Sequence, residues 1–240
     1  MSETDRLPST ARLMRAVDAT WPPARMVTCG GWTLRAGGGG GKRVSAARGT
    51  GEIAEAEAGM AALDQPPLFA LTPGEDALDK ALAMRGYEMV DPVALYAQPV
   101  IELADGRDET AKVIRCAAPL RRIEEIWDRG GVGPARRAVM ERASGPKQVL
   151  MARAGDRPAG CAFVACDDEI AMVHAVEVLP EYRKQGVGER LMRGAASFAA
   201  DHGAAWLTLA VTEENLPANR LYQKLGMEVA GHYHYRAKPS

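Results

Sequence analysis

The stretch of the chain best suited to bind a ligand lies at residues 176–191. A β-branched run ends at Pro180, and the pattern Arg183-x-x-Gly186-x-Gly188 follows it. Apolar residues at helical spacing begin immediately afterwards, so the predicted order is strand, glycine loop, helix. Glycines let the main chain approach a ligand closely, and the first amides of a helix attract anions. The pattern predicts a phosphate-binding loop; the alternative is that its glycines only shape a tight turn.

Two other nucleotide-binding patterns do not fit this loop. A dinucleotide fingerprint would need a third glycine at position 191, where the chain has Leu191. A Walker loop would need Gly-Lys-Ser or Gly-Lys-Thr, which the loop lacks. The loop alone therefore leaves the ligand undecided.

A second stretch downstream decides between the two interpretations. Residues 215–227 read Asn-Leu-Pro-Ala-Asn-Arg-Leu-Tyr-Gln-Lys-Leu-Gly-Met and follow another apolar run, Trp206–Val211. Together the two stretches resemble the GNAT superfamily of acyl-CoA-dependent N-acetyltransferases, whose patterns are Arg/Gln-x-x-Gly-x-Gly/Ala and Asn-x-x-Ala-x-x-Leu-Tyr-x-x-x-Gly-Phe. Met227 replaces the usual Phe, which exchanges one buried apolar residue for another. The resemblance covers about residues 110–240.

The resemblance implies a GNAT fold, which is a mixed, mostly antiparallel sheet with flanking helices, and acetyl-CoA as co-substrate. In the family the loop amides bind the pyrophosphate, the edge of the preceding strand binds the pantetheine arm, and the strands before and after the helix splay apart to admit the cofactor. The residues so implied in cofactor binding are Val176, Val178, Arg183, Lys184, Gln185, Gly186, Val187, Gly188, Asn215 and Tyr222.

Acetyl transfer to an amine needs a base, because a protonated amine has no lone pair, and a proton for the departing thiolate. The resemblance assigns the proton to Tyr222; the alternative is a tyrosine of the core. Family members often place Glu nine residues before the loop arginine, where this chain has His174, and the acid on the same strand is Glu177. The base is His174, Glu177 or an ordered water. Because a strand alternates faces, both side chains can face the acceptor only across a bulge, which the family often has there.

The composition indicates a globular protein whose partner is a small molecule or a protein. The formal net charge is −1 over 240 residues, and no Lys/Arg run exceeds two residues, which argues against nucleic acid or a membrane as partner. Signal-peptide and membrane-spanning patterns are missing, so we expect a cytoplasmic protein. The four cysteines have no Cys-x-x-Cys spacing, and His232-x-His234 lacks a visible third ligand, so we expect no metal site.

The first half of the chain resembles the second half at an offset of 140 residues. Residues 69–99 share six identities with 209–239 in a gapless alignment. In the first copy Glu75 and Leu82 stand where the second has Asn215 and Tyr222, so the first copy lacks the chemistry. The polar segment 104–109 is the predicted boundary. We expect a smaller, degenerate and non-catalytic GNAT-like α/β domain at residues 1–104 and a catalytic GNAT domain at 105–240.

Hydrophobic periodicity and turn residues predict the elements of both halves. In the first half they predict helices at 10–20, 51–64 and 75–85, strands at 30–36, 42–47 and 68–72, and an extended segment at 87–101, with glycines 37–41 as a hairpin connection between the first two strands. In the second half they predict strands at 112–116, 148–154, 159–166, 171–179, 205–211 and 227–237, and helices at 120–127, 134–143, 188–202 and 217–225.

The sequence leaves the acceptor open: a small-molecule amine or amino acid, an antibiotic, and a protein N-terminus or lysine are all compatible with the family fold. In the GNAT fold the helices at 120–127 and 134–143 lie over the acceptor side, which makes Trp127, Arg136 and Arg137 candidates for acceptor contacts. The alternative is a core tryptophan and two solvated arginines. The rival function is a module that binds acyl-CoA as a sensor or scaffold and transfers nothing; the presence of both Tyr222 and a possible base argues against it.

Overall fold

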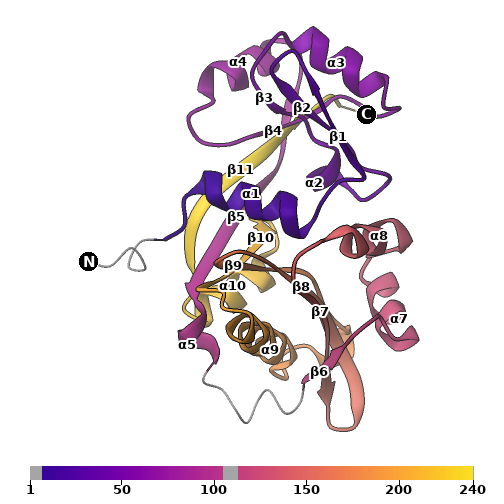
Figure 1. The fold of residues 1–240 in the computed structure, drawn as a ribbon, viewed down its shortest axis with the longest axis vertical. Helices are drawn as coiled ribbons and strands as arrows, with labels where there is room; N and C mark the ends of the chain where they lie inside the picture. The colour runs from indigo at the N-terminus through magenta and orange to yellow at the C-terminus, as the bar shows by residue number, and fades with distance from the viewer. Residues whose placement is uncertain (1–6, 105–112, 240) are drawn as a thin grey trace.

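Eight strands form the large sheet of the computed structural model, which describes residues 7–104 and 113–239 (Figure 1). Their order is β4-β11-β5-β10-β9-β8-β7-β6. All neighbours are antiparallel except β9 and β10, which run parallel. This confirms the expected mixed, mostly antiparallel sheet. The strands are β4 (Leu68–Leu71), β5 (Glu88–Pro99), β6 (Val113–Cys116), β7 (Lys147–Ala154), β8 (Arg157–Asp167), β9 (Ile170–Val178), β10 (Trp206–Thr212) and β11 (Glu228–Ala237).

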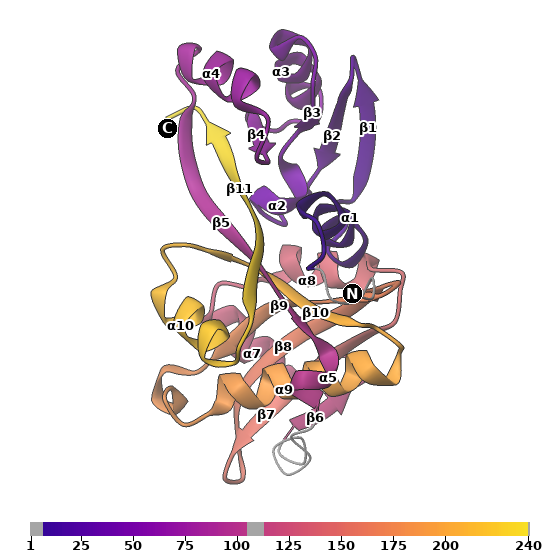
Figure 2. The same ribbon diagram turned by 90° about the vertical axis from the view of Figure 1, so that its left-hand side faces the viewer.

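Helices cover both faces of this sheet, because its strands alternate apolar residues between two cores. Val149 and Met151 of β7 pack with α7 (Arg121–Arg129) and α8 (Pro134–Arg142), whereas Leu150 and Ala152 pack with α9 (Val187–Asp201). Figure 2 shows α9 together with α5 (Val100–Ala104) on one face. The apolar side predicted for α9 is the buried one: Leu191, Met192, Ala195, Phe198 and Ala199.

Strand β5 of the first half is inserted between two strands of the second half, and β5 and β11 run side by side along the molecule (Figure 2). The pairing follows the 140-residue offset of the sequence. Ala70 of β4 pairs with Tyr235 of β11. Their counterparts at the 140-residue offset, Ala210 and Leu95, also pair with each other, between β10 and β5. The division into domains at 1–104 and 105–240 remains a prediction, and its boundary segment lies mostly outside the described residues.

The remaining elements of the first half form a separate small sheet and four helices. The sheet has the order β1-β2-β3, with strands β1 (Arg25–Cys29), β2 (Trp32–Ala36) and β3 (Arg48–Gly49). The helices are α1 (Thr10–Thr20), α2 (Lys42–Ser45), α3 (Ile53–Ala61) and α4 (Asp76–Met84). Helix α1 packs against the large sheet through Leu13 and Val17, so this half is anchored to the strands of the other.

The strand predicted at 42–47 is wrong, because residues Lys42–Ser45 form helix α2. The hairpin turn lies at Gly30 and Gly31, between β1 and β2, and glycines 37–41 instead lead into α2. A Cβ on Gly40 would lie 2.6 Å from a methyl of Val139 on α8 and 2.8 Å from a methyl of Val44. The glycine run thus allows this segment to pack closely against α8. The segment predicted as extended at 87–101 likewise ends as a strand at Pro99, where α5 begins.

The described cysteines are all free, and Cys116, Cys161 and Cys166 are buried. Burial raises the pKa of the Cys166 thiol to about 11, so this thiol stays protonated. No helix in the described part of the chain combines the length and apolar character needed to cross a membrane.

Candidate active site

Strands β9 and β10 separate part-way along their length. Their parallel pairing runs from Ile170–Trp206 to Val173–Leu209 and ends there. Beyond that point a cavity of about 490 Å³ opens between them, lined by residues 173–177 of β9 and 209–212 of β10. The structure thus confirms the predicted splay and leaves one edge of β9 free to bind an extended ligand.

A bulge in β9 turns two candidate bases toward this cavity. Phe163 of β8 lies opposite His174, but Cys161 lies opposite Glu177, so β9 has one residue more than its partner between these pairs. Ala175 in this bulge has a φ of +49°, and its carbonyl accepts a hydrogen bond from Trp127 Nε1 at 2.9 Å. The bulge required by the sequence for both residues to face one site is therefore present, and both line the cavity.

Glu177 is half-buried at the cavity wall. Burial raises the pKa of its carboxyl group, while the nearby Arg183 and Arg136 lower it. A Cβ on Gly130 would lie 2.2 Å from the carboxyl carbon of Glu177, so the missing side chain at position 130 makes room for this carboxylate. A carboxylate with a raised pKa is suited to accept a proton from an amine.

His174 is buried, with an exposed fraction of 2%, and both of its ring nitrogens have partners. The hydroxyl of Thr20 donates to Ala16 O at 2.6 Å and therefore accepts the hydrogen bond from His174 Nε2, at 2.9 Å. Nδ1 then accepts from Arg43 at 3.2 Å. Burial, and after it the charge of Arg43, lower the pKa of His174 well below its usual value, so the imidazole is neutral.

Tyr222 and Asn215 reach the cavity from the other side, on α10 (Leu216–Lys224) and its N-cap. The Tyr222 ring is buried and lies 5.7 Å from the ring of Tyr96. Burial, and then the charges of Glu177 and Tyr96, raise the pKa of its phenol above the usual value, so the hydroxyl keeps its proton. Asn215 accepts a hydrogen bond from the Ala218 amide at 3.3 Å, which fixes the start of α10.

The glycine loop lies beyond the cavity, between β9 and α9. Val176 lines the cavity, while Val178 and the loop residues 183–188 lie outside its lining. Gly186 has a φ of +75° and forms the N-cap of α9, which places the first amides of this helix at the loop. Arg183 donates from Nε to Val178 O at 3.3 Å. The predicted order of strand, glycine loop and helix is confirmed.

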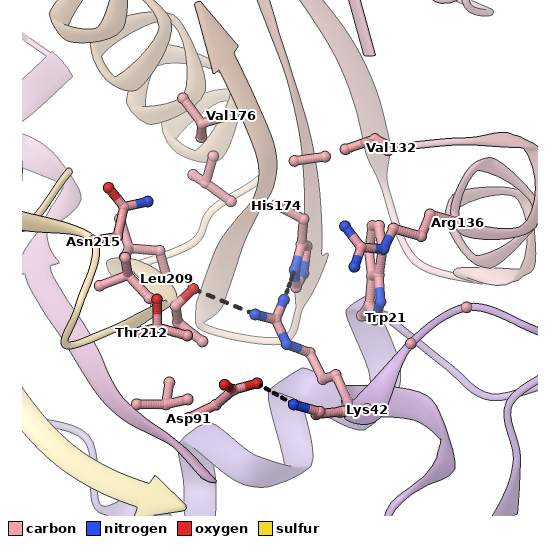
Figure 3. Close-up of a pocket in the computed structure, with 18 of the residues that line it drawn as sticks. Trp21, Lys42, Asp91, Val132, Arg136, His174, Val176, Leu209, Thr212 and Asn215 are labelled. Atoms are coloured by element: carbon pink, nitrogen blue, oxygen red, sulfur yellow. Dashed lines mark hydrogen bonds and ion pairs between the residues drawn. The ribbon is translucent and has the colours of Figure 1, made fainter. Parts of the chain in front are cut away.

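The first half of the chain supplies one wall of the cavity. Its lining residues are Trp21, Gly40, Gly41, Lys42, Arg43, Asp91 and Val93. Lys42 forms an ion pair with Asp91 at 2.8 Å, and Arg43 donates to Ala210 O at 3.3 Å. Figure 3 shows Trp21 and Arg136 on the side of the cavity opposite Asn215 and Thr212.

Comparison with known proteins gives the family. Residues 118–227 match the model of the Acetyltransferase (GNAT) family. This part of the chain belongs to the GNAT acetyltransferases. The chain is also 27% identical to the uncharacterized N-acetyltransferase YobR of Bacillus subtilis (strain 168), over 95% of this chain and 98% of the relative. The protein is therefore an acyltransferase of the GNAT type.

Two solved structures share the fold of this acetyltransferase. A GCN5-related N-acetyltransferase from Kribbella flavida superposes with a TM-score of 0.66 at 20% identity, over 95% of each chain. A tandem GNAT protein from the clavulanic acid biosynthesis pathway superposes with a TM-score of 0.56 at 16% identity, over 78% of this chain and 69% of the other. The similarity extends over both halves of the chain, while a degenerate first copy remains a prediction.

The sequence missed the residues that the first half of the acetyltransferase brings to its cavity. The only sequence signal for Arg43 is that it belongs to a basic pair directly after a glycine run, and the pattern of residues 42–47 predicts a strand there. Of the three acceptor-side candidates, Arg136 lines the cavity, whereas Trp127 is fully buried in the core and Arg137 pairs with Asp128.

Proposed function

We propose that the protein transfers the acetyl group of acetyl-CoA to a primary amine. The observation that carries this proposal is the cavity between the splayed strands, which has Glu177 on one wall and Tyr222 on the other. A proton acceptor and a proton donor thus face the space between them. Acetyl transfer to an ammonium ion needs one of each.

The donor would bind along the free edge of β9 and at the glycine loop. Its pyrophosphate would accept hydrogen bonds from the amides of residues 183–188 and the first turn of α9, where the helix dipole favours an anion. The exposed position of this loop and the positive φ of Gly186 fit such an approach of the main chain. The pantetheine arm would pair with Val176 and Val178 as an added strand, and Asn215 would contact it from the opposite side.

Glu177 is our choice for the base. Its carboxylate would take a proton from the substrate ammonium, directly or through a water, so that the amine nitrogen can attack the thioester carbonyl. The C–N bond forms, the C–S bond breaks, and the thiolate takes a proton from the Tyr222 hydroxyl. The proton on Glu177 passes through solvent to the phenolate, and the second proton of the attacking nitrogen leaves to solvent as the amide forms. His174 is the weaker candidate, because accepting a proton would cost it the hydrogen bond from Arg43.

A thiol-release assay tests the proposal. Purified protein is mixed with acetyl-CoA and a library of amines, and free CoA is followed with a thiol reagent while mass spectrometry identifies the acetylated product. We expect amine-dependent release that Glu177→Gln slows by about 10²-fold or more. Tight binding of acetyl-CoA without transfer to any amine would instead support a sensor or scaffold.

A further inference from the structure

Three cationic side chains line the cavity: Lys42, Arg43 and Arg136. Two of them have an anion nearby in the protein itself. Lys42 forms its ion pair with Asp91, and Arg136 interacts electrostatically with Glu177. Arg43 has no such anion among the described residues, and its side chain reaches between the separated strands β9 and β10.

Among the described residues, Arg43 contacts only neutral groups. Its guanidinium donates to His174 Nδ1 at 3.2 Å and to Ala210 O at 3.3 Å, and it interacts with the hydroxyls of Tyr233 and Tyr235. Within residues 7–104 and 113–239, no carboxylate forms an ion pair with it. The two hydrogen bonds run to β9 and β10, so they hold the guanidinium across the opening between these strands.

A cation placed in a partly buried site without a counter-charge is costly, since its desolvation is not offset by an attractive charge. In this protein, two neutral acceptors, His174 Nδ1 and Ala210 O, fix the direction of the Arg43 guanidinium. A ligand anion would supply the missing charge. The planar fork of an arginine matches the two oxygens of a carboxylate especially well.

We propose that the acceptor carries a carboxylate that binds Arg43, and that it is a free amino acid or a similar small amino carboxylate. This inference rests on the proposed function. The base and the cation line the same chamber, because the bulge turns Glu177 and His174 to one side and His174 orients Arg43. An amine at Glu177 and a carboxylate at Arg43 can therefore belong to one compact molecule, and a cavity of about 490 Å³ suits a small ligand.

This assignment gives the first half of the chain a positioning and specificity role. The residue that recognises the acceptor comes from α2, while the groups that move protons come from β9 and α10. Gly40, just before α2, closely approaches Val139 of α8, and Val44 of α2 packs in the same core as Val139. This packing holds Lys42 and Arg43 at the cavity.

The test compares the twenty standard amino acids with the corresponding amino acid amides as acceptors of the wild-type protein. Both series present the same side chains, but only the acids present a carboxylate. We expect kcat/KM for the preferred amino acid to exceed that for its amide by about 10²-fold, the scale of a lost charged hydrogen-bond partner. This preference would arise even though the amide has the less basic and more readily deprotonated amine.

The variant Arg43→Gln should remove this preference by raising KM for the amino acid about 10²-fold while changing kcat/KM for the amide less than threefold. Arg43→Lys should restore part of the preference. Arg121→Gln, which changes an exposed arginine on α7, serves as the control and should behave as wild type. Binding of acetyl-CoA and the melting temperature check that each variant is folded, and the wild-type comparison stands without any variant.

Each outcome is decisive. Equal rates with acids and amides would overturn the carboxylate assignment while leaving acetyl transfer in place. A preference for aminophosphonates over amino acids would also overturn it, in favour of a phosphate-like anion. Transfer to none of the amines would overturn the proposed function itself.

Discussion

The guanidinium of Arg43 donates a hydrogen bond to Nδ1 of His174 over 3.2 Å. This bond joins a helix of the first half to the central strand of the site. Because Nε2 of the same ring bonds to Thr20, the neutral imidazole is held between two partners. His174 thus acts through Arg43 as a positioning residue in our mechanism, and Glu177 acts on the amine.

His174→Asn separates these two roles. The Asn amide oxygen can replace Nδ1 as an acceptor for Arg43, but it cannot take up a proton. We expect kcat to stay within about tenfold of wild type and the acid limb of its pH profile to stay in place, whereas loss of a general base would cost about 10²–10⁴-fold. His174→Ala, which also removes the acceptor, should raise KM for the amine further. A loss of the acid limb in His174→Asn would identify His174 as the base.

The pH dependence of kcat tests Glu177. Only the carboxylate can accept a proton, so kcat should fall as the pH drops through the pKa of Glu177. Burial raises this pKa above the usual glutamate value, and the positive charge of Arg136 opposes part of that rise. Arg136→Gln removes a lowering contribution, so the acid limb should move to higher pH.

The matched control for this shift is Arg137→Gln. Arg137 is the neighbouring residue on α8 but pairs with Asp128 and lies outside the cavity lining. Its replacement should leave the acid limb where it is in wild type. If both variants gave the same profile, Glu177 would not be the titrating base.

The elements that the sequence predicted best are those whose pattern is local. The loop at 183–188 and the buried face of α9 follow from glycine spacing and helical periodicity, and the family resemblance located the bulge between His174 and Glu177. Arg43 could not be predicted in this way. Its place in the site depends on the packing of α2 against α8, and α2 has only four residues, too few to show a period.

The position of β5 in the large sheet also could not be predicted from local sequence patterns. The 140-residue repeat was visible in the sequence, but it did not show that Leu95 would pair with Ala210 of the other half. Strand order depends on long-range pairing. The local sequence indicates only that β5 is apolar. Its buried residues, Val93 to Gln98, fit a strand that is covered on both faces.

Asp79 provides a test of the contact between α4 and β11. Its carboxylate binds Arg236 at 2.7 Å and His234 at 2.7 Å, and the hydrogen bond from Arg236 is the main reason that its pKa is lowered from 3.8 to about 2. A lowered pKa stabilises the folded state above the pKa of the unfolded chain, and this contribution is lost as the pH falls from about 4 to about 2.

Asp79→Asn should therefore lower the free energy of unfolding at neutral pH by about 2 kcal/mol, the value of a shift of this size. The difference from wild type should shrink as the pH is lowered toward 2. Urea unfolding at several pH values measures this. Asp76→Asn, an exposed carboxylate on the same helix, is the control, and an equal loss in both variants would rule out the bond to β11 as the cause.

Tyr222→Phe tests the proton donor, since it removes only the hydroxyl and leaves the ring against Tyr96. If the phenol protonates the departing thiolate, kcat should fall by about 10²-fold with little change in the dissociation constant for acetyl-CoA. The loss should be smaller with an acetyl thioester whose thiol is more acidic than that of CoA, because such a leaving group needs less help. The melting temperature should stay near that of wild type. A kcat within about twofold of wild type for every donor would make Tyr222 a core tyrosine, and the thiolate would then take its proton from solvent.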